Sequence, residues 1–221
     1  MKKFSIYILF ALIAALTTGL SSCSETNDEV EEYPNWKVTN DEFFEKKYAE
    51  VKQLADGGSN EWKVIRTWNL DESVATHSYD HILVDVQQAG NGSGCPLYTD
   101  SVKVHYTGRL LPSTTYTDGY MFDKSWSGEE FNDSTALPAK FAVSGLVPGF
   151  TTALMNMHIH DKWRVYIPYQ LGYGSSANPG AAYSTLIFDI ELVAYYRANS
   201  TASKSAARKA AGKSRGEWIY E

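Results

Sequence analysis

The sequence has few of the residues and patterns from which many functional sites are built. Only two of its 221 residues are cysteines, Cys23 and Cys95, which excludes a framework of several disulfides. The net charge is −6, and no stripe of basic residues is interleaved with aromatics, which argues against nucleic acid as a partner. No phosphate-binding glycine loop occurs, and His158 and His160 alone supply too few ligands for a metal. We therefore expect no cofactor and no metal.

No apolar run is long enough to span a membrane, but residues 1–22 have the pattern of a secretory signal. A positively charged start precedes an apolar stretch over residues 4–16. Leu20-Ser21-Ser22 stands directly before Cys23 and resembles the lipobox of bacterial lipoproteins. This resemblance implies lipidation of Cys23 and a lipid-anchored protein of the cell envelope, in the outer membrane, facing the periplasm or the cell surface. The alternative is an ordinary secretory signal with a chance cysteine.

A polar, acidic composition indicates a flexible tether over residues 23–38. Residues 40–55 have the pattern of a helix, with Thr39 or Asn40 as its cap and Gly57-Gly58 as its stop. An apolar stripe recurs on it at helical spacing: Phe43, Phe44, Tyr48, Val51 and Leu54. We expect this stripe either to dock on the main domain or to pair with a partner chain.

Strands outnumber helices in the rest of the chain. Alternating or apolar runs predict strands over residues 61–68, 81–87, 101–110, 121–123, 140–143, 163–167 and 185–195. Pro148–Met157 is the one clear helix of this part, with Pro148 well placed near its start. Short connections favour antiparallel pairing, so the predicted class is α+β, with an N-terminal helical and strand extension over residues 39–80. Residues 198–221 are rich in Ala, Ser and Lys and predict a polar, flexible tail.

Five motifs follow one another in an order that resembles a known family. They are VKVHYTG at 102–108, FDKS at 122–125, LVPGF at 146–150, KWRVYIPYQLGYG at 162–174 and STLIFDIEL at 184–192. Together they resemble the FKBP-type peptidyl-prolyl cis-trans isomerases, the macrolide-binding immunophilins. The resemblance implies an isomerase domain over residues 81–197, built as a curved antiparallel sheet wrapped around a short helix. It also implies proline-containing exported polypeptides as substrates, and macrolides as ligands.

The resemblance further implies a proline pocket between the sheet and the helix. Its catalytic residues are Tyr106, Asp123 and Tyr173, and its substrate-binding residues are Phe122, Phe141, Leu146, Val147, Phe150 and Phe188. Phe150 is expected as the floor, with Tyr106, Phe141 and Phe188 as walls. The Val147 amide and the Tyr173 hydroxyl are expected to donate to substrate carbonyls. Asp123 is expected to orient the twisted carbonyl or to hold Tyr106.

The chain departs from the family pattern at several places. Phe150 stands where the family usually has a tryptophan, and Gly180–Tyr183 replaces an Ile-Pro-Pro loop. Two insertions, Pro112–Tyr120 and Ser125–Ala136, lengthen the segments beside Asp123. These departures bear on substrate preference and macrolide affinity.

A dry aromatic pocket suits amide rotation because the reaction needs no nucleophile. The X–Pro bond resists rotation with a barrier of about 18–20 kcal/mol, and the twisted transition state has lost its resonance. The alternative function is a non-catalytic peptide-binding or chaperone module on the same scaffold. A third hypothesis is an interaction protein that dimerises through the helix at 40–55.

Overall fold

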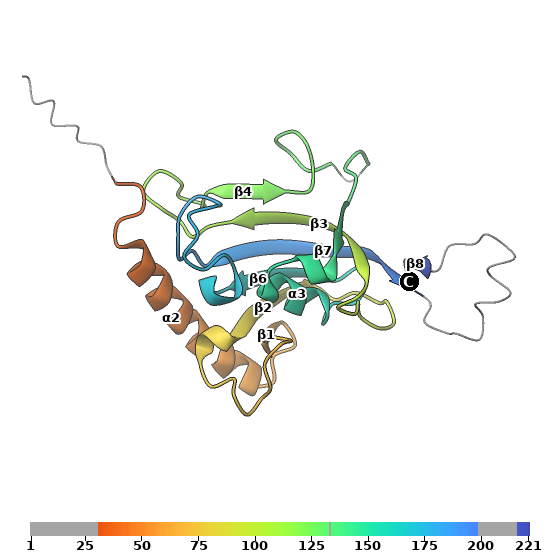
Figure 1. Ribbon diagram of the computed structural model, residues 1–221, viewed down its shortest axis with the longest axis horizontal. Helices are drawn as coiled ribbons and strands as arrows, with labels where there is room; N and C mark the ends of the chain where they lie inside the picture. Colours follow the sequence, from red (N-terminus) through yellow and green to blue (C-terminus); the bar gives the residue numbers. More distant parts are fainter. Residues whose placement is uncertain (1–30, 133, 199–215) are drawn as a thin grey trace, which may run out of the picture. The chain divides into compact units, whose positions relative to one another are not determined.

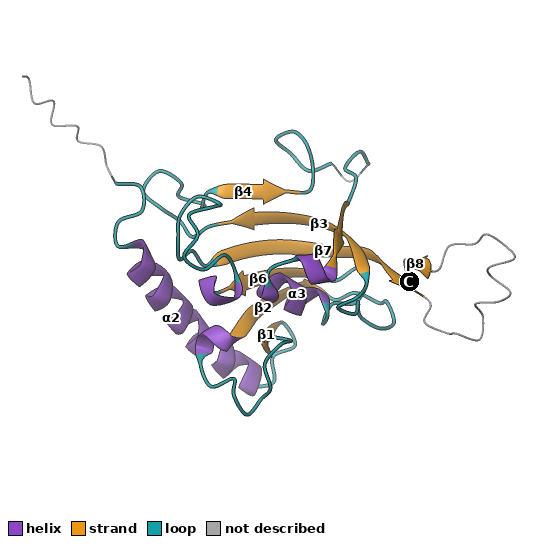
Figure 2. Cartoon of the chain, viewed as in Figure 1, coloured by secondary structure: helices purple, strands orange, loops and turns teal. Residues whose placement is uncertain are grey.

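The computed structural model describes residues 31–132, 134–198 and 216–221, and its main element is an antiparallel sheet with two α-helices packed on it (Figures 1 and 2). The predicted signal peptide and Cys23 lie outside the described residues. Within the described ranges, neither helix is long and apolar enough to cross a membrane. The predicted α+β class is confirmed.

The sheet has the strand order β1-β2-β6-β7-β3-β4, and β5 also pairs with β3 while β8 pairs with β7. Its strands are β1 (Trp62–Arg66), β2 (His81–Gln88), β3 (Ser101–Arg109), β4 (Met121–Lys124), β5 (Ala139–Ala142), β6 (Lys162–Ile167), β7 (Leu186–Ala198) and β8 (Gly216–Ile219). The helices are α2 (Trp36–Asp56) and α3 (Pro148–Leu154), with 3-10 turns η1 (Ser78–Asp80), η2 (Val143–Gly145) and η3 (Tyr169–Leu171). Each predicted strand is present, with bounds shifted by a few residues at most.

The core lies between the sheet and α3. Residues of β3 alternate between buried and half-buried, and Val102, Val104 and Tyr106 share the buried face as predicted. Pro148 occupies the first turn of α3, where its missing N–H removes no helical hydrogen bond. A bulge shifts the β3–β7 register after Lys103, and the two long strands curve past α3 (Figure 1).

Helix α2 begins at Trp36, four residues before its predicted start at Asn40, and neither Thr39 nor Asn40 caps it. Asn35 takes the capping position without a side-chain hydrogen bond. The start is set by tertiary anchoring, because Trp36 is buried and its indole Nε1 donates to Ser184 Oγ at 2.7 Å. The predicted stop is confirmed, since α2 ends directly before Gly57-Gly58.

The apolar stripe of α2 docks on the sheet of its own chain. Four of its predicted members are buried or partly buried: Phe43, Phe44, Tyr48 and Val51. Phe44 and Val51 pack with Leu83 of β2, whose neighbours Ile82 and Val84 belong to the core on the α3 side. The prediction for Leu54 was wrong, since that side chain is 40% exposed at the last turn of the helix. Docking is therefore the alternative that the structure supports.

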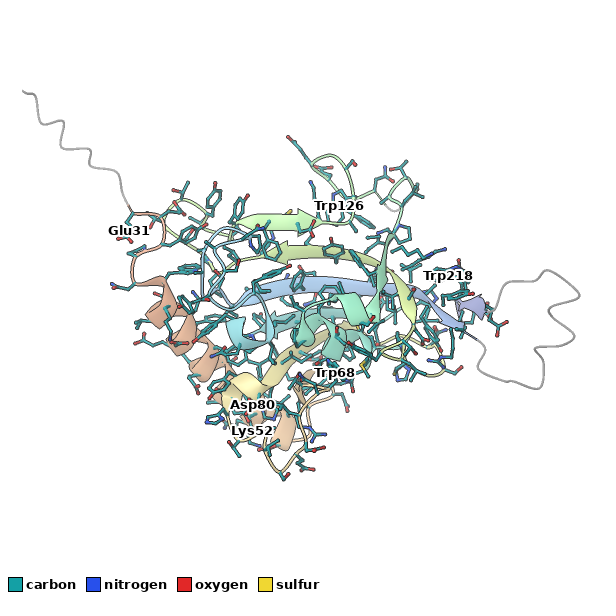
Figure 3. The ribbon with its side chains drawn as sticks, viewed as in Figure 1. Glu31, Lys52, Trp68, Asp80, Trp126 and Trp218 are labelled. Carbon is teal, nitrogen blue, oxygen red and sulfur yellow. The ribbon has the colours of Figure 1, made fainter. Side chains whose placement is uncertain are left out.

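The predicted flexible tail over residues 198–221 was wrong at its end, where β8 pairs with β7. The anchor of this strand is aromatic. Trp218 packs on Tyr196 with ring centroids 5.6 Å apart, and the Lys103 and Lys140 ammonium groups lie 4.6 and 5.2 Å from the Trp218 ring (Figure 3). Residues 199–215 of the predicted tail are outside the described part.

The predicted divisions at residues 38 and 80 do not separate structural units. The predicted tether reaches into α2, because Trp36 already belongs to the helix. The predicted extension pairs β1 with β2 over five residues, from Trp62–Asp85 to Arg66–His81. The described chain from Glu32 onward forms one compact unit as a result.

Replacing Asn40 tests the docking of α2. The Asn40 side chain is 1% exposed, its Nδ2 donates to the Trp36 carbonyl at 2.7 Å, and its Oδ1 accepts from the Thr185 amide at 2.6 Å. Asn40→Ala should lower the free energy of unfolding by about 1–3 kcal/mol, because the Thr185 amide loses its buried acceptor. Urea unfolding measures this change. The matched control is Asn60→Ala in an exposed turn, and an equal effect of both substitutions would contradict the interpretation.

Candidate functional site

A cavity of about 200 Å³ lies between the sheet and the start of α3. It is lined by residues from β3, β4, β5, β7 and α3, the segment before α3 and the loop after η3: Tyr106, Asp123, Phe141, Gly145, Leu146, Val147, Phe150, Tyr173 and Phe188. Seven parts of the chain thus converge on one largely apolar space. We refer to it as the aromatic pocket.

The β3–β7 pairing aligns two of the pocket aromatics. Tyr106 pairs with Ile190, and Gly108 pairs with Phe188. The rings of Tyr106 and Phe188 therefore lie on neighbouring strands, offset by two residues along the pairing, and on the same face of the sheet. Gly108 is required here, because a Cβ at this position would lie 2.7 Å from the ring of Phe188 and 2.6 Å from the ring of Phe122. The glycine that ends the VKVHYTG motif therefore makes room for the aromatic packing.

The rings of the pocket pack edge to face. Phe150 and Phe188 have centroids 4.9 Å apart at 86°, and Tyr106 stands at 86° to Phe150 at 6.0 Å. Tyr106 and Phe141 are 5.7 Å apart at 60°. Each of these geometries is favourable for aromatic quadrupoles. Phe150 and Phe188 are each 3% exposed, so the deep part of the pocket is apolar and closely packed.

One hydrogen bond defines the polar side of the pocket. The Tyr106 hydroxyl donates to Asp123 Oδ2 at 2.7 Å, and Asp123 Oδ1 accepts from the Lys124 amide at 2.9 Å. Burial raises the pKa of the Tyr106 phenol well above its ordinary value, and the hydrogen bond to Asp123 raises it further. The phenol is therefore a neutral donor, while the Asp123 side chain lies at the exposed rim.

Two further donors face the same space. Tyr173 is 42% exposed, and burial together with the nearby Asp123 charge raises the pKa of its phenol. The Val147 amide, in extended backbone directly before α3, donates to no acceptor among the described residues. Both groups can hydrogen-bond to a carbonyl that enters the pocket.

The structure brings together eight of the nine residues predicted from the sequence. Phe122 is the ninth, and it stands behind the wall, with its ring 5.5 Å from Phe188 and 6.5 Å from Tyr173. Gly145 was missed, because nothing in its composition distinguishes it from other turn glycines. Phe122 therefore supports the wall from outside the cavity.

The divergent loop Gly180–Tyr183 does not line the pocket. Tyr183 has a positive φ of 60°, and its ring packs on Tyr169 with centroids 5.3 Å apart. The Lys37 ammonium of α2 lies 5.7 Å from the Tyr183 ring, and Ser184 Oγ donates to the Ala181 carbonyl at 2.7 Å. The loop is thus held against the N-terminal helix.

The predicted histidine pair lies away from the pocket. His158 Nδ1 is 3.8 Å from Cys95 Sγ, and the Asp161 carboxylate accepts from the His158 amide at 2.6 Å. Burial raises the pKa of the Cys95 thiol. In the described ranges no three His, Cys, Asp or Glu side chains are grouped so as to hold a metal ion.

Comparison with known proteins points to one family. Residues 95–193 match the family model of FKBP-type peptidyl-prolyl cis-trans isomerases. The chain is 41% identical over 101 residues to the FKBP-type 22 kDa peptidyl-prolyl cis-trans isomerase of Escherichia coli K12, a match that covers 44% of this chain and 42% of that protein.

A second relative is also described as an FKBP-type peptidyl-prolyl cis-trans isomerase, and a third is described as an outer membrane protein. FkpA of Escherichia coli K12 is 33% identical over 151 residues, covering 67% of this chain and 51% of that one. The outer membrane protein MIP of Legionella longbeachae is 37% identical over 112 residues, a match that covers 50% of this chain and 42% of that protein. The chain therefore spans about half the length of these relatives or less. A crystal structure of FkpA from Escherichia coli matches with 26% identity and a TM-score of 0.43, covering 71% of this chain and 62% of that one.

The raised pKa of Tyr106 predicts a loss of stability in alkali. The unfolded chain releases the phenol proton near the ordinary pKa of about 10, whereas the folded chain retains it. The stabilisation is therefore complete below about pH 10 and is lost as the pH rises towards the folded pKa. Tyr106→Phe should remove part of this loss. Urea unfolding of both proteins at about pH 8 and about pH 10.5 measures it, and identical pH dependence would contradict the assignment.

Proposed function

We propose that this protein catalyses the cis–trans isomerisation of X–Pro peptide bonds, because residues 95–193 match the family model of FKBP-type peptidyl-prolyl cis-trans isomerases. The observation that carries the proposal is the aromatic pocket, in which eight side chains expected from the family motifs meet around one cavity. Proline-containing exported polypeptides are the proposed substrates. A macrolide is a second proposed ligand of the same pocket.

The proposed mechanism is selective binding of a twisted amide. In the planar isomers, resonance polarises the carbonyl, and water solvates it well. The twisted amide has lost this resonance, so a dry aromatic surface disfavours it less than it disfavours the planar forms. Each 1.4 kcal/mol of preferential binding accelerates the reaction about tenfold. No proton has to leave or join a reacting atom for the bond to rotate.

The pocket residues take roles that follow from their positions. Phe150, from the first turn of α3, is the proposed floor for the prolyl ring, with Tyr106, Phe141 and Phe188 as walls. The Val147 amide and the Tyr173 hydroxyl are the proposed donors to the substrate carbonyls on either side of the rotating bond. Asp123 fixes the Tyr106 hydroxyl and places a negative charge at the rim, where it would act on the carbonyl carbon of the twisted amide.

The cell envelope is the proposed location. The lipobox-like sequence before Cys23 supports a lipid anchor, and one relative is described as an outer membrane protein. We infer that lipidated Cys23 tethers the protein to the outer membrane, with the pocket facing the periplasm or the cell surface. In this position, the protein would meet polypeptides after their export.

The alternative is a peptide-binding module without isomerase activity. Phe150 gives a smaller floor than the tryptophan that is usual in the family, which favours weaker engagement of the prolyl ring. Edge-to-face packing of Phe150 on Phe188 nevertheless keeps the floor aromatic and fixed. The isomerase proposal therefore accounts for more of the site.

Asp123→Ala tests the proposed mechanism at an exposed position where folding is little affected. We expect kcat/KM for a Xaa-Pro tetrapeptide to fall about tenfold or more, because the Tyr106 hydroxyl loses its acceptor and the rim loses its charge. A protease-coupled or NMR exchange assay measures the rate.

The matched control for Asp123 is Asp118→Ala, which removes an exposed carboxylate in the turn before β4 and should leave the rate unchanged. If the intact protein does not accelerate isomerisation at all, the peptide-binding alternative is the better account.

Cys23→Ser tests the anchor. The substituted precursor cannot accept a thioether-linked lipid, so we expect it to leave the membrane fraction and to lose incorporation of labelled fatty acid. Cys95→Ser changes the other cysteine and should retain both. Fatty-acid labelling of the Cys23→Ser protein at the wild-type level would rule out the proposed attachment.

A further inference from the structure

A second groove, of about 340 Å³, lies on the face of the sheet opposite to the aromatic pocket, between β3, β7 and β6 and the loop after β4. We propose that this outer groove binds an extended, uncharged segment of polypeptide with apolar side chains, independently of proline. The proposal goes beyond isomerisation, because it concerns a different face of the sheet and a ligand that need not contain the X–Pro bond.

The floor of the outer groove is a pair of cross-strand rows. The register aligns Thr107, Asp189 and Arg164 in one row across β3, β7 and β6. It aligns His105, Glu191 and Lys162 in a second row, and each of these residues lies two positions from its counterpart in the first row on the same strand. Since side chains alternate across a sheet, all six point away from the face that carries Tyr106.

The charges of this floor neutralise each other. Arg164 Nε and Nη2 donate to the two oxygens of Asp189 at 2.7 and 3.0 Å, and Lys162 Nζ lies 3.1 Å from Glu191. Two cations and two carboxylates are therefore paired side by side. A charged ligand would meet an ion of its own sign as closely as one of the opposite sign, so the floor gives it no net attraction.

The wall of the outer groove is aromatic. Phe131 is 40% exposed, and its ring centroid lies 5.0 Å from those of both Trp126 and His105. Ser125 fixes this loop to β3, because its amide donates to the Tyr106 carbonyl at 3.0 Å and its Oγ accepts from the Tyr106 amide at 3.0 Å. The wall is thus held in place from the strand that carries the pocket.

One polar atom of the wall is unsatisfied. The indole Nε1 of Trp126 is buried and has no hydrogen-bond partner within the described residues. A buried N–H without an acceptor costs free energy. Because this atom has almost no exposed surface, Trp126 contributes the apolar part of its ring to the wall of the outer groove.

A polypeptide fits this combination better than a small ion or a lipid. Its backbone presents both N–H and C=O groups to a floor that holds both carboxylates and cations, and its apolar side chains match the wall of Trp126 and Phe131. Strand addition is excluded along the floor, because β3, β7 and β6 are each paired on both edges there. The protein must therefore recognise the polypeptide through the side chains that line the outer groove, and not by pairing its own strands with the ligand backbone.

The outer groove and the aromatic pocket are back to back on one strand. Tyr106 faces the pocket, while His105 and Thr107 on either side of it face the groove. An unfolded polypeptide held in the outer groove would stay near the protein while its proline residues reach the pocket. The groove would thereby raise the local concentration of substrate.

Trp126→Ala in the full-length protein tests the proposal. The probe is a fluorescein-labelled, uncharged, proline-free decapeptide rich in leucine and phenylalanine, and binding is measured by fluorescence anisotropy. We expect saturable binding to the wild type and a Kd raised about tenfold or more by Trp126→Ala, as for loss of an aromatic anchor. Isomerisation of a Xaa-Pro tetrapeptide by this variant should be unchanged.

The matched control is Trp68→Ala, which removes a tryptophan that is 41% exposed and lies near α3, far from Trp126 (Figure 3). This control should leave the Kd unchanged. No saturable binding by the wild type, or an equal Kd for Trp126→Ala, would overturn the proposal. Absence of isomerase activity alone would instead overturn the proposed function and leave the peptide measurement intact.

A second measurement detects binding in the wild-type protein and needs a variant only to assign one signal. The indole N–H signal of Trp126, identified by its absence in Trp126→Phe, should shift when the decapeptide is added. The signals of Tyr173 in the pocket should not shift. A shift of the Trp126 signal by maltoheptaose and not by the decapeptide would show a carbohydrate site and overturn the proposal.

Discussion

The pairing of β3 with β7 is the constraint on which both faces of the sheet depend. It runs from Ser101–Tyr196 to Arg109–Ile187 with a single bulge after Lys103. Because side chains alternate with a period of two, a slip of one residue would turn Tyr106 outward and bring His105 or Thr107 into the core. The bulge determines which residues of β3 face the core from Val104 onward, and Gly108 leaves space for the ring of Phe188 in this register. The aromatic pocket and the outer groove are therefore two consequences of one strand pairing.

The N-terminal helix extends this constraint to the segment before β7. Trp36 holds Ser184, and Asn40 holds the amide of Thr185, so α2 fixes the chain just before the strand that carries Phe188. The divergent loop Gly180–Tyr183 packs on the same helix through Tyr183 and Lys37. The loop is therefore held from α2 and does not line the pocket.

Local patterns in the sequence were sufficient to predict most of the elements. The alternation in β3, the proline at the start of α3 and the glycines after α2 each act through neighbours within a few residues, so they can be read from the chain. The site residues needed the order of five motifs, since composition alone does not separate pocket aromatics from core aromatics. Features set by distant contacts were missed. The start of α2 depends on Ser184, and β8 depends on an edge of β7 and on Lys103 and Lys140, none of which is close in sequence.

The distribution of polar groups explains how one sheet can hold two different kinds of site. In the aromatic pocket, the deep residues are phenylalanines, and the polar groups of Asp123, Tyr106 and Tyr173 lie towards its mouth. In the proposed amide rotation the floor supplies only an apolar shape, while Asp123 and the hydrogen-bond donors act at the mouth, so a phenylalanine in place of a tryptophan changes the depth of the floor and leaves its apolar character the same. On the outer face, Lys162 and Arg164 form ion pairs with Glu191 and Asp189, so their charges offset one another. The proposed ligand is therefore selected by the wall of Trp126 and Phe131. Since the proposed isomerisation places no requirement on that wall, the exposed aromatic side chain of Phe131 and its contact with Trp126 are best explained by binding.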